Sequence, residues 1–124
     1  MIVGLGVDLL ENDRVERELG RGAWFANDGV FTDSEVRQCA GGRSAARRYA
    51  ACFAAKEATL KALGVAASDL AMFREVEVVL TQGVGTIVLH DRLRSHAERL
   101  GVRSIRLSVA PAKKLTGALV ILEA

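Results

Sequence analysis

Three charged side chains in this sequence have the types and spacing that phosphate chemistry needs. Glu57 and Lys61 lie four residues apart in the apolar stretch RRYAACFAAKEATLKALG, and Asp8 follows a run of apolar residues and glycines near the N-terminus. Two carboxylates from different elements suit Mg²⁺, which binds one or two carboxylates and completes its octahedron with waters and substrate phosphates. A lysine beside them would neutralise charge on a transferring phosphate. These residues are the first candidates for a catalytic site.

Each of these residues also has a simpler structural interpretation. A Glu–Lys pair at positions i and i+4 commonly stabilises a helix by ~0.2–0.5 kcal/mol. Asp8 alone is explained as the polar end of a strand, or as a cap for a helix that begins near Glu11. Only the combination of Asp8, Glu57 and Lys61 favours a metal and phosphate site, so their positions in the fold must decide.

The stretch that carries Glu57 and Lys61 predicts a largely buried helix. Alanine and leucine favour helix, and Gly64 fits the residue just past a helix C-terminus. From Tyr49 to Leu63 nearly every other position is apolar, so most of the helix circumference should be buried. Ionised groups on such a helix are costly unless they are paired, hydrogen-bonded or coordinated to a metal.

The stretch IVGLGVDL predicts the strand that positions Asp8. Its alternation places Val3, Leu5, Val7 and Leu9 on one face and Ile2, Gly4, Gly6 and Asp8 on the other. Glycines within a strand often mark close approach by another backbone or a ligand. Asp8 therefore lies on the face that something else approaches closely.

The rest of the chain predicts further helices and strand pairs joined by short turns. Thr32 with Glu35 three residues later is a capping box, which marks a helix start. Helices are also expected over 11–22 and 91–101, strands over 74–82, 103–110 and 116–122, and a turn followed by a strand over 82–90. Short turns between consecutive strands favour antiparallel pairing. We therefore predict an α+β fold with an antiparallel sheet packed against helices.

The composition is that of one globular domain, residues 1–124, with half of its residues hydrophobic. The longest apolar runs, such as GALVIL, are much shorter than the ~20 residues that a membrane-spanning helix requires. Met1 leads straight into a strand-like segment without a basic signal-peptide region. We expect a cytoplasmic protein with no membrane partner. Cys39 and Cys52 are too few for a disulfide framework and are expected to be reduced, packed thiols.

The charge distribution gives little support for nucleic-acid binding. The net charge of +2 is small. Basic residues do follow one another after Glu35, at Arg37, Arg43, Arg47, Arg48 and Lys56. That segment could receive phosphates, although a solvated loop and helix end explains it more simply. Because the chain lacks interleaved aromatics and any recognised binding module, we expect no nucleic-acid partner.

Three stretches of the chain match one known pattern: GVDLLENDR near the N-terminus, FTDSEVRQC in the middle, and FAAKEATLKALG. The most specific part is FAAKEA followed by Lys61, with Asp8 at its expected distance upstream. In this combination the whole chain resembles the holo-acyl-carrier-protein synthase family, the small phosphopantetheinyl transferases. The resemblance implies an α+β fold that usually assembles as a homotrimer, with active sites at subunit interfaces.

The same resemblance implies a reaction and a set of site residues. The phosphopantetheine arm of coenzyme A would move to a serine of an apo acyl carrier protein, releasing adenosine 3',5'-bisphosphate. By position, Asp8 and Glu57 resemble the Mg²⁺ ligands. Glu57, directly or through a water, would help remove the serine proton, and Lys61 would stabilise charge on the pyrophosphate and leaving group.

Further residues are expected to bind the two substrates. The resemblance places Lys56 beside the phosphates of coenzyme A, together with Lys61. It also matches Arg14, Arg17 and Arg21 to a basic first helix that docks the acidic carrier protein. A solvated arginine stripe is an equal alternative for Arg17 and Arg21, whereas Arg14 matches better.

The chain departs from the family pattern at three places. Cys52 stands where an arginine is common, Gly85 stands where a proline would stiffen a turn, and Ala110 with Pro111 replaces a Ser–His pair. Arg47 and Arg48 are expected to bind coenzyme A in place of the lost groups. The alternative is a divergent member that binds a carrier protein without transfer, or acts on its attached acyl chain. The sequence does not distinguish fatty-acid from polyketide or peptide synthesis.

Overall fold

The computed structural model describes residues 1–22, 29–81 and 84–124. Within them lie five strands and five helices. Their bounds are β1 (Ile2–Glu11), α1 (Asn12–Arg21), α2 (Asp33–Cys39), α3 (Ala45–Leu63), α4 (Leu70–Arg74), β2 (Val76–Thr81), β3 (Val84–Leu89), α5 (Asp91–Arg99), β4 (Ser104–Pro111) and β5 (Leu115–Glu123). The predicted α+β class is confirmed.

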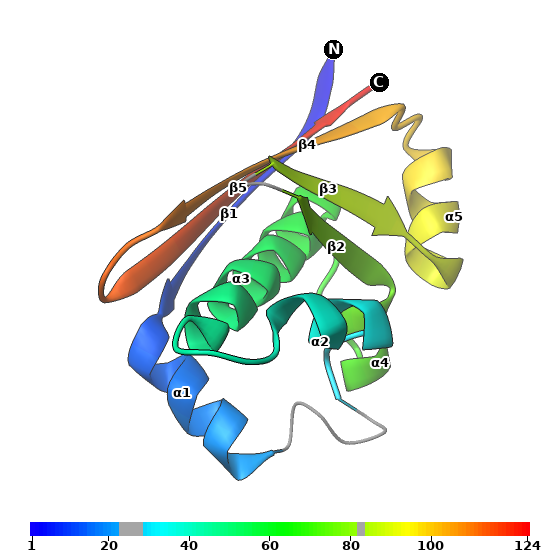
Figure 1. Ribbon diagram of the computed structural model, residues 1–124. Helices are drawn as coiled ribbons and strands as arrows, with labels where there is room; N and C mark the ends of the chain where they lie inside the picture. The colour runs from blue at the N-terminus through cyan, green and yellow to red at the C-terminus, as the bar shows by residue number, and fades with distance from the viewer. Residues whose placement is uncertain (23–28, 82–83) are drawn as a thin grey trace.

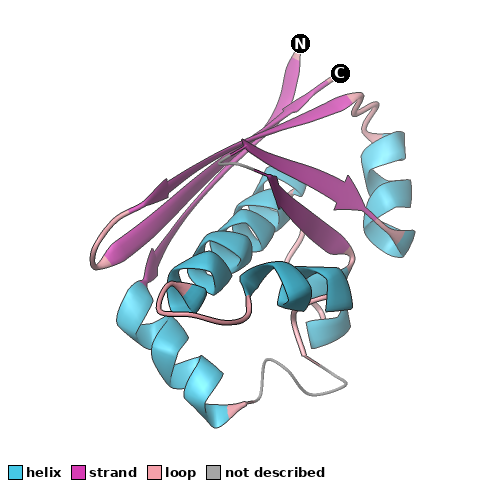
Figure 2. Cartoon of the chain, viewed as in Figure 1, coloured by secondary structure: helices cyan, strands magenta, loops and turns pink. Residues whose placement is uncertain are grey.

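The strands pair in the antiparallel direction, as predicted. They form two sheets instead of one. The three-stranded sheet has the order β1-β5-β4, and β2 pairs with β3 in a two-stranded sheet. Helix α3 runs along the inner face of the three-stranded sheet, while α2 covers the other side of α3 (Figure 1). Figure 2 shows that the chain begins and ends on adjacent strands, β1 and β5, so the two termini lie side by side. Within the described residues, no helix is long and apolar enough to cross a membrane.

Strand β1 and helix α3 meet backbone to backbone. A Cβ added to Gly6 would lie 1.9 Å from the carbonyl oxygen of Ala58, and one added to Gly4 would lie 2.3 Å from that of Ala62. The predicted close approach at the strand glycines is therefore confirmed. Gly4 faces Ala62 and Gly6 faces Ala58, so a step of two residues along β1 matches a step of one turn back along α3. Asp8, two residues after Gly6, therefore lies beside the helix turn that precedes Ala58.

The opposite face of β1 is apolar and exposed. Leu5, Val7 and Leu9 are 59%, 52% and 72% exposed, and they alternate with the glycine face as predicted. Among the described elements, none covers this face of the sheet (Figure 1). A row of exposed apolar side chains of this kind marks an interaction surface.

The helix boundaries follow the local signals that the sequence contains. Thr32 accepts a hydrogen bond from the Glu35 backbone N–H, and the Glu35 carboxylate accepts one from the Thr32 N–H, which confirms the capping box. Helix α3 ends at Leu63, and Gly64 adopts the left-handed conformation with φ 71°. Each signal acts within a few residues, which explains why the sequence alone revealed it.

Two features differ from the sequence predictions. The short helix α4 was not expected; Asp69 caps it by accepting a hydrogen bond from the Met72 N–H at 2.8 Å. Gly85 is a residue of β3 paired with Leu80, so its interpretation as a turn residue was wrong. Its missing side chain leaves room for Leu107, whose Cδ2 would lie 2.6 Å from an added Cβ. The predicted turn residues 82–83 lie outside the described part of the chain.

We expect Gly6→Ala to lower the free energy of unfolding by about 3 kcal/mol, because the new methyl group must displace the α3 backbone. Gly20→Ala is the matched control: an added Cβ meets nothing within 4 Å there, and alanine favours a helix interior by up to ~1 kcal/mol. Urea denaturation followed by circular dichroism measures both changes. Equal stability of the two variants would contradict the close strand–helix contact.

Candidate functional site

The strand–helix contact brings Asp8 and Lys61 together. The Lys61 Nζ donates to Asp8 Oδ1 at 3.0 Å and to the carbonyl oxygen of Val7 at 3.1 Å. The Lys61 side chain is 53% exposed and that of Asp8 only 12%. The lysine thus pairs across elements, from α3 to β1, and its half-exposed ammonium can still meet a ligand.

Glu57 belongs to the same electrostatic group. Burial of its carboxyl raises the pKa of Glu57 above the ordinary value, and the negative charge of Asp8 raises this pKa further. The positive charges of Lys61 and Arg14 act in the opposite direction. The two acidic side chains are therefore close enough to repel each other, with an exposed lysine and an arginine beside them. A carboxyl with a raised pKa in such a group is typical of a functional site.

The chemistry of this group fits Mg²⁺. Asp8 and Glu57 supply hard oxygen ligands, and their mutual repulsion would be relieved by a cation. Within the described ranges no set of three or more His, Cys, Asp and Glu side chains is placed to hold a metal ion. Mg²⁺ usually binds through one or two carboxylates and keeps waters and substrate phosphates in the other positions. Two carboxylates are thus a sufficient protein contribution.

Lys56 lies in a buried network of the fold, whereas the sequence predicted a place for it beside phosphates. Its side chain and that of Glu35 are both 0% exposed, with Nζ 2.7 Å from Glu35 Oε1. The same ammonium donates to the carbonyl oxygens of Phe73 at 2.7 Å and Val76 at 2.5 Å. All three donors of the ammonium are therefore used inside the protein, and none remains for a phosphate.

Glu35 completes this buried network, and only its part in the capping box was predicted from the sequence. One carboxylate oxygen closes the capping box with Thr32, and Oε2 accepts a hydrogen bond from the Val78 N–H at 2.7 Å. Glu35 thus joins α2 to β2 while it neutralises Lys56 on α3. The available sequence signal was a lysine in an otherwise apolar run, which needs an acidic partner when buried.

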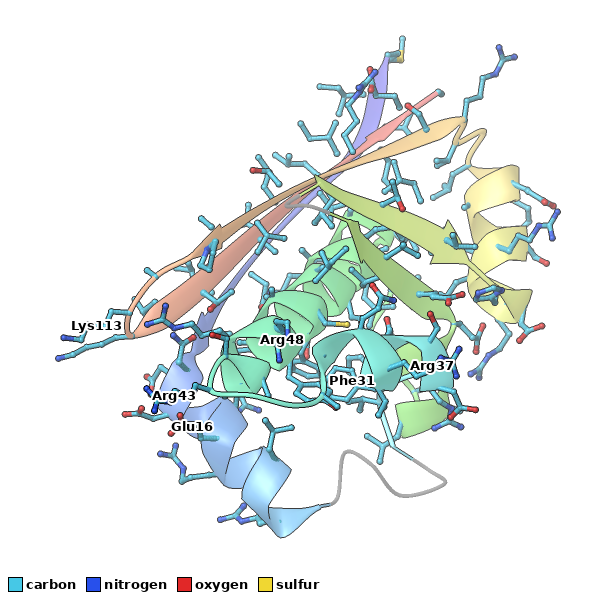
Figure 3. The ribbon with its side chains drawn as sticks, in the orientation of Figure 1. Glu16, Phe31, Arg37, Arg43, Arg48 and Lys113 are labelled. Atoms are coloured by element: carbon cyan, nitrogen blue, oxygen red, sulfur yellow. The ribbon has the colours of Figure 1, made fainter. Side chains whose placement is uncertain are left out.

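Arg47 and Arg48 lie at a different place from Glu57. Together with Ser44, Ala51, Leu80 and Pro111 they line a cavity of about 250 Å³. Arg48 donates through Nε to the carbonyl oxygen of Cys39 at 3.0 Å, whereas Arg47 is exposed. Figure 3 shows Arg48 on the side of α3 that faces α2, with Arg43 on the loop between these helices.

The positions on α3 separate the two groups of residues. Arg47 precedes Glu57 by ten residues, which corresponds to ~15 Å along a helix axis. The predicted coenzyme A residues Arg47 and Arg48 are therefore not gathered around the acidic pair within one chain. The chain instead carries two separate part-sites, the acidic pair of Asp8 and Glu57 and the cavity with Arg47 and Arg48.

Helix α1 carries the predicted basic residues at the end of β1. Arg14, Arg17 and Arg21 are exposed, and Arg21 pairs with Glu18 at 3.2 Å. Of the three arginines, Arg14 influences the pKa of Glu57, which places it beside the acidic pair. The α1 surface thus adjoins the candidate site.

Asn12 anchors the start of α1, a role that the sequence analysis missed. Its Nδ2 donates to the carbonyl oxygens of Ala112 at 2.8 Å and Lys113 at 3.1 Å. Its Oδ1 accepts from the buried Thr116 hydroxyl at 2.7 Å. An asparagine at a helix start is typical of a local cap. Nothing in the sequence therefore indicated hydrogen bonds to the distant β4–β5 turn.

Comparison with known proteins identifies the family of this chain. Residues 4–112 match the 4'-phosphopantetheinyl transferase superfamily. A holo-[acyl-carrier-protein] synthase of Solibacter usitatus is 40% identical over 124 residues, 99% of each chain. This chain belongs to the 4'-phosphopantetheinyl transferase superfamily. It is an enzyme of that class.

Solved structures of the superfamily share the fold. The holo-[acyl-carrier-protein] synthase of Neisseria meningitidis gives a TM-score of 0.85 at 26% identity and covers 100% of both chains. That of Bacillus anthracis, described in complex with CoA (3',5'-ADP), gives a TM-score of 0.77 at 27% identity and covers 100% of this chain and 98% of its own. The transferase fold extends over the full length of this chain.

We expect Lys56→Met to destabilise this transferase by about 3–5 kcal/mol, because Glu35 would remain buried without its partner. Lys61→Met is the matched control and should cost only about 0–1 kcal/mol, since its ion pair is half exposed. Urea denaturation measures both. Equal losses of stability would contradict the structural role assigned to Lys56.

Proposed function

We propose that this protein transfers the phosphopantetheine arm of coenzyme A to a serine hydroxyl of an apo acyl carrier protein, with Mg²⁺ bound, and releases adenosine 3',5'-bisphosphate. The observation that carries the proposal is the grouping of Asp8, Glu57 and Lys61 at the β1–α3 contact. The names of the relatives and the coenzyme A complex of the Bacillus anthracis enzyme support the two substrates.

The acidic pair has two proposed tasks. Asp8 and Glu57 would hold Mg²⁺, which would supply positive charge next to the substrate phosphates. Glu57 would also accept the serine proton, directly or through a water. Its raised pKa supports this role, because a general base works best when its pKa approaches the operating pH.

Lys61 is proposed to stabilise negative charge on the diphosphate and the leaving group. Its ammonium is already aimed at the acidic pair and is half exposed. Exchanging Asp8 for a phosphate oxygen would therefore require only a movement of the flexible side chain. A fixed positive charge at the point where charge develops is a common source of rate enhancement.

The substrate contacts are proposed as follows. The cavity with Arg47 and Arg48 would receive the nucleotide part of coenzyme A, because guanidinium groups bind phosphates well and the cavity is otherwise largely apolar. The exposed arginines of α1, Arg14, Arg17 and Arg21, would dock the acidic carrier protein next to Glu57. Charge complementarity there would mainly raise the association rate and selectivity.

We further propose a homotrimer in which the two part-sites meet across subunit interfaces. The exposed apolar face of β1, with Leu5, Val7 and Leu9, offers a surface that association would bury. The separation of Arg47 from Glu57 along α3 supports the same assembly, since a single chain does not gather them. An active site completed by a neighbour would make activity depend on assembly.

Incubation with coenzyme A, Mg²⁺ and an apo acyl carrier protein should add the mass of one phosphopantetheine group to the carrier, as measured by mass spectrometry. Removal of Mg²⁺ by a chelator should abolish transfer. Glu57→Gln should lower kcat by about 10²-fold or more. Glu98→Gln, an exposed acid on α5, should have no effect. Carrier binding without added mass would contradict the proposal.

Light scattering should give a mass of about three times the 13.3 kDa chain. Val7→Asp should yield monomers without transfer activity, because a charge cannot be buried in the apolar interface. Val88→Asp, which changes an exposed valine on β3, should remain trimeric and active. A monomeric wild-type enzyme with full activity would overturn the assembly.

A further inference from the structure

The start of α1 is hydrogen-bonded to the tip of the β4–β5 hairpin through one residue, Asn12. Its Nδ2 donates to the carbonyl oxygens of Ala112 at 2.8 Å and Lys113 at 3.1 Å. Its backbone N–H donates to the carbonyl oxygen of Lys114 at 2.9 Å. Its Oδ1 accepts from the hydroxyl of Thr116, on β5, at 2.7 Å. We call these four hydrogen bonds the hairpin anchor.

The hairpin anchor takes the place of a local helix cap. Strand β1 ends at Glu11 and α1 begins at Asn12, so no loop residue separates them. Among the described residues, the N-cap residue Glu11 makes no side-chain hydrogen bond to the helix. The first N–H groups of a helix need acceptors outside it, and that of Asn12 finds one on the hairpin. The position of the first turn of α1 therefore depends on the hairpin.

The innermost bond of the hairpin anchor is shielded from water. Thr116 is 0% exposed and Asn12 is 9% exposed. Without the Thr116 hydroxyl, the Asn12 Oδ1 would lose its partner in a place where water does not readily replace it. Because Thr116 is fully enclosed, it cannot contact a substrate. Its hydroxyl can influence binding only through Asn12.

The anchored first turn of α1 carries Arg14. This arginine follows Asn12 by two residues and is exposed, whereas the next residue, Val15, is fully buried in the core. Burial raises the pKa of Glu57, and the positive charge of Arg14 opposes this rise. Arg14 thus belongs to the anchored turn and lies within electrostatic reach of the acidic pair.

We propose that Asn12 and Thr116 are positioning residues for recognition of the carrier protein, because their hydrogen bond holds the first turn of α1 where Arg14 can meet an acidic carrier. This inference rests on the proposed docking of the carrier on α1. The two residues act through Arg14 and take no part in the transfer step. Loss of the anchor would let the first turn move and would weaken carrier binding.

The experiment titrates the full-length protein with fluorescently labelled apo acyl carrier protein in the absence of coenzyme A. Thr116→Val removes the hydroxyl at nearly constant side-chain size and should raise Kd about fivefold. Thr116→Ser is the matched control: it keeps the hydroxyl, so Kd should stay close to that of the wild type. An unchanged Kd in Thr116→Val would overturn the proposal. So would an equal rise in Thr116→Ser.

A double-mutant cycle separates positioning from a general loss of structure. Arg14→Ala should raise Kd by at least as much as Thr116→Val does. In the Arg14→Ala background, Thr116→Val should cause no further rise, because the side chain that it positions is already absent. A merely structural effect would weaken binding in both backgrounds. Additive effects of the two substitutions would therefore overturn the proposal.

The outcomes also distinguish this inference from the docking on which it rests. If Arg14→Ala weakens carrier binding and Thr116→Val does not, the docking stands and only the positioning role is overturned. If Arg14→Ala binds like the wild type, both are overturned. Circular dichroism checks that each variant is folded. Should Thr116→Val prove unfolded, Asn12→Ala takes its place in the same titration and the same cycle.

Discussion

The structure depends on the direct contact between the backbone of β1 and that of α3. Gly4 and Gly6 allow it, because any side chain there would overlap the carbonyl oxygens of Ala62 and Ala58. Once these positions are in contact, the next residue on the same face of β1 has one possible neighbourhood on the helix. Asp8 therefore reaches Lys61 and the Glu57 carboxyl, and the acidic pair arises from packing that has no catalytic residue in it.

The two lysines of α3 differ in burial, and only the exposed one is proposed to act on a substrate. Lys56 is fully enclosed, with every donor satisfied by Glu35 and two carbonyl groups. Lys61 lies little more than one turn later on the same helix, yet half of its side chain is exposed. The buried pair fixes α3 against α2 and β2. One motif thus carries a buried structural lysine and an exposed lysine that is proposed to meet the substrate phosphates.

Two surfaces of the single chain support the proposed assembly. One is the apolar face of β1, and the other is the cavity with Arg47 and Arg48. Arg47 precedes Glu57 on α3 by about three helical turns, ~15 Å along the helix axis. The proposed trimer would bury the apolar face of β1 and bring the arginine cavity of one chain to the acidic pair of its neighbour. One association would thus account for both surfaces.

The sequence by itself determined the features that depend on a few neighbouring residues. These include the capping box at Thr32, the glycine stop after α3, the alternation of β1 and the family to which the motifs belong. Tertiary structure alone decided which charges are paired. Lys56 pairs with Glu35 of another helix, and Asn12 donates a hydrogen bond to a turn one hundred residues away. Gly85 likewise leaves room for Leu107. Partners of this kind are chosen by packing between distant elements, and no local pattern records them.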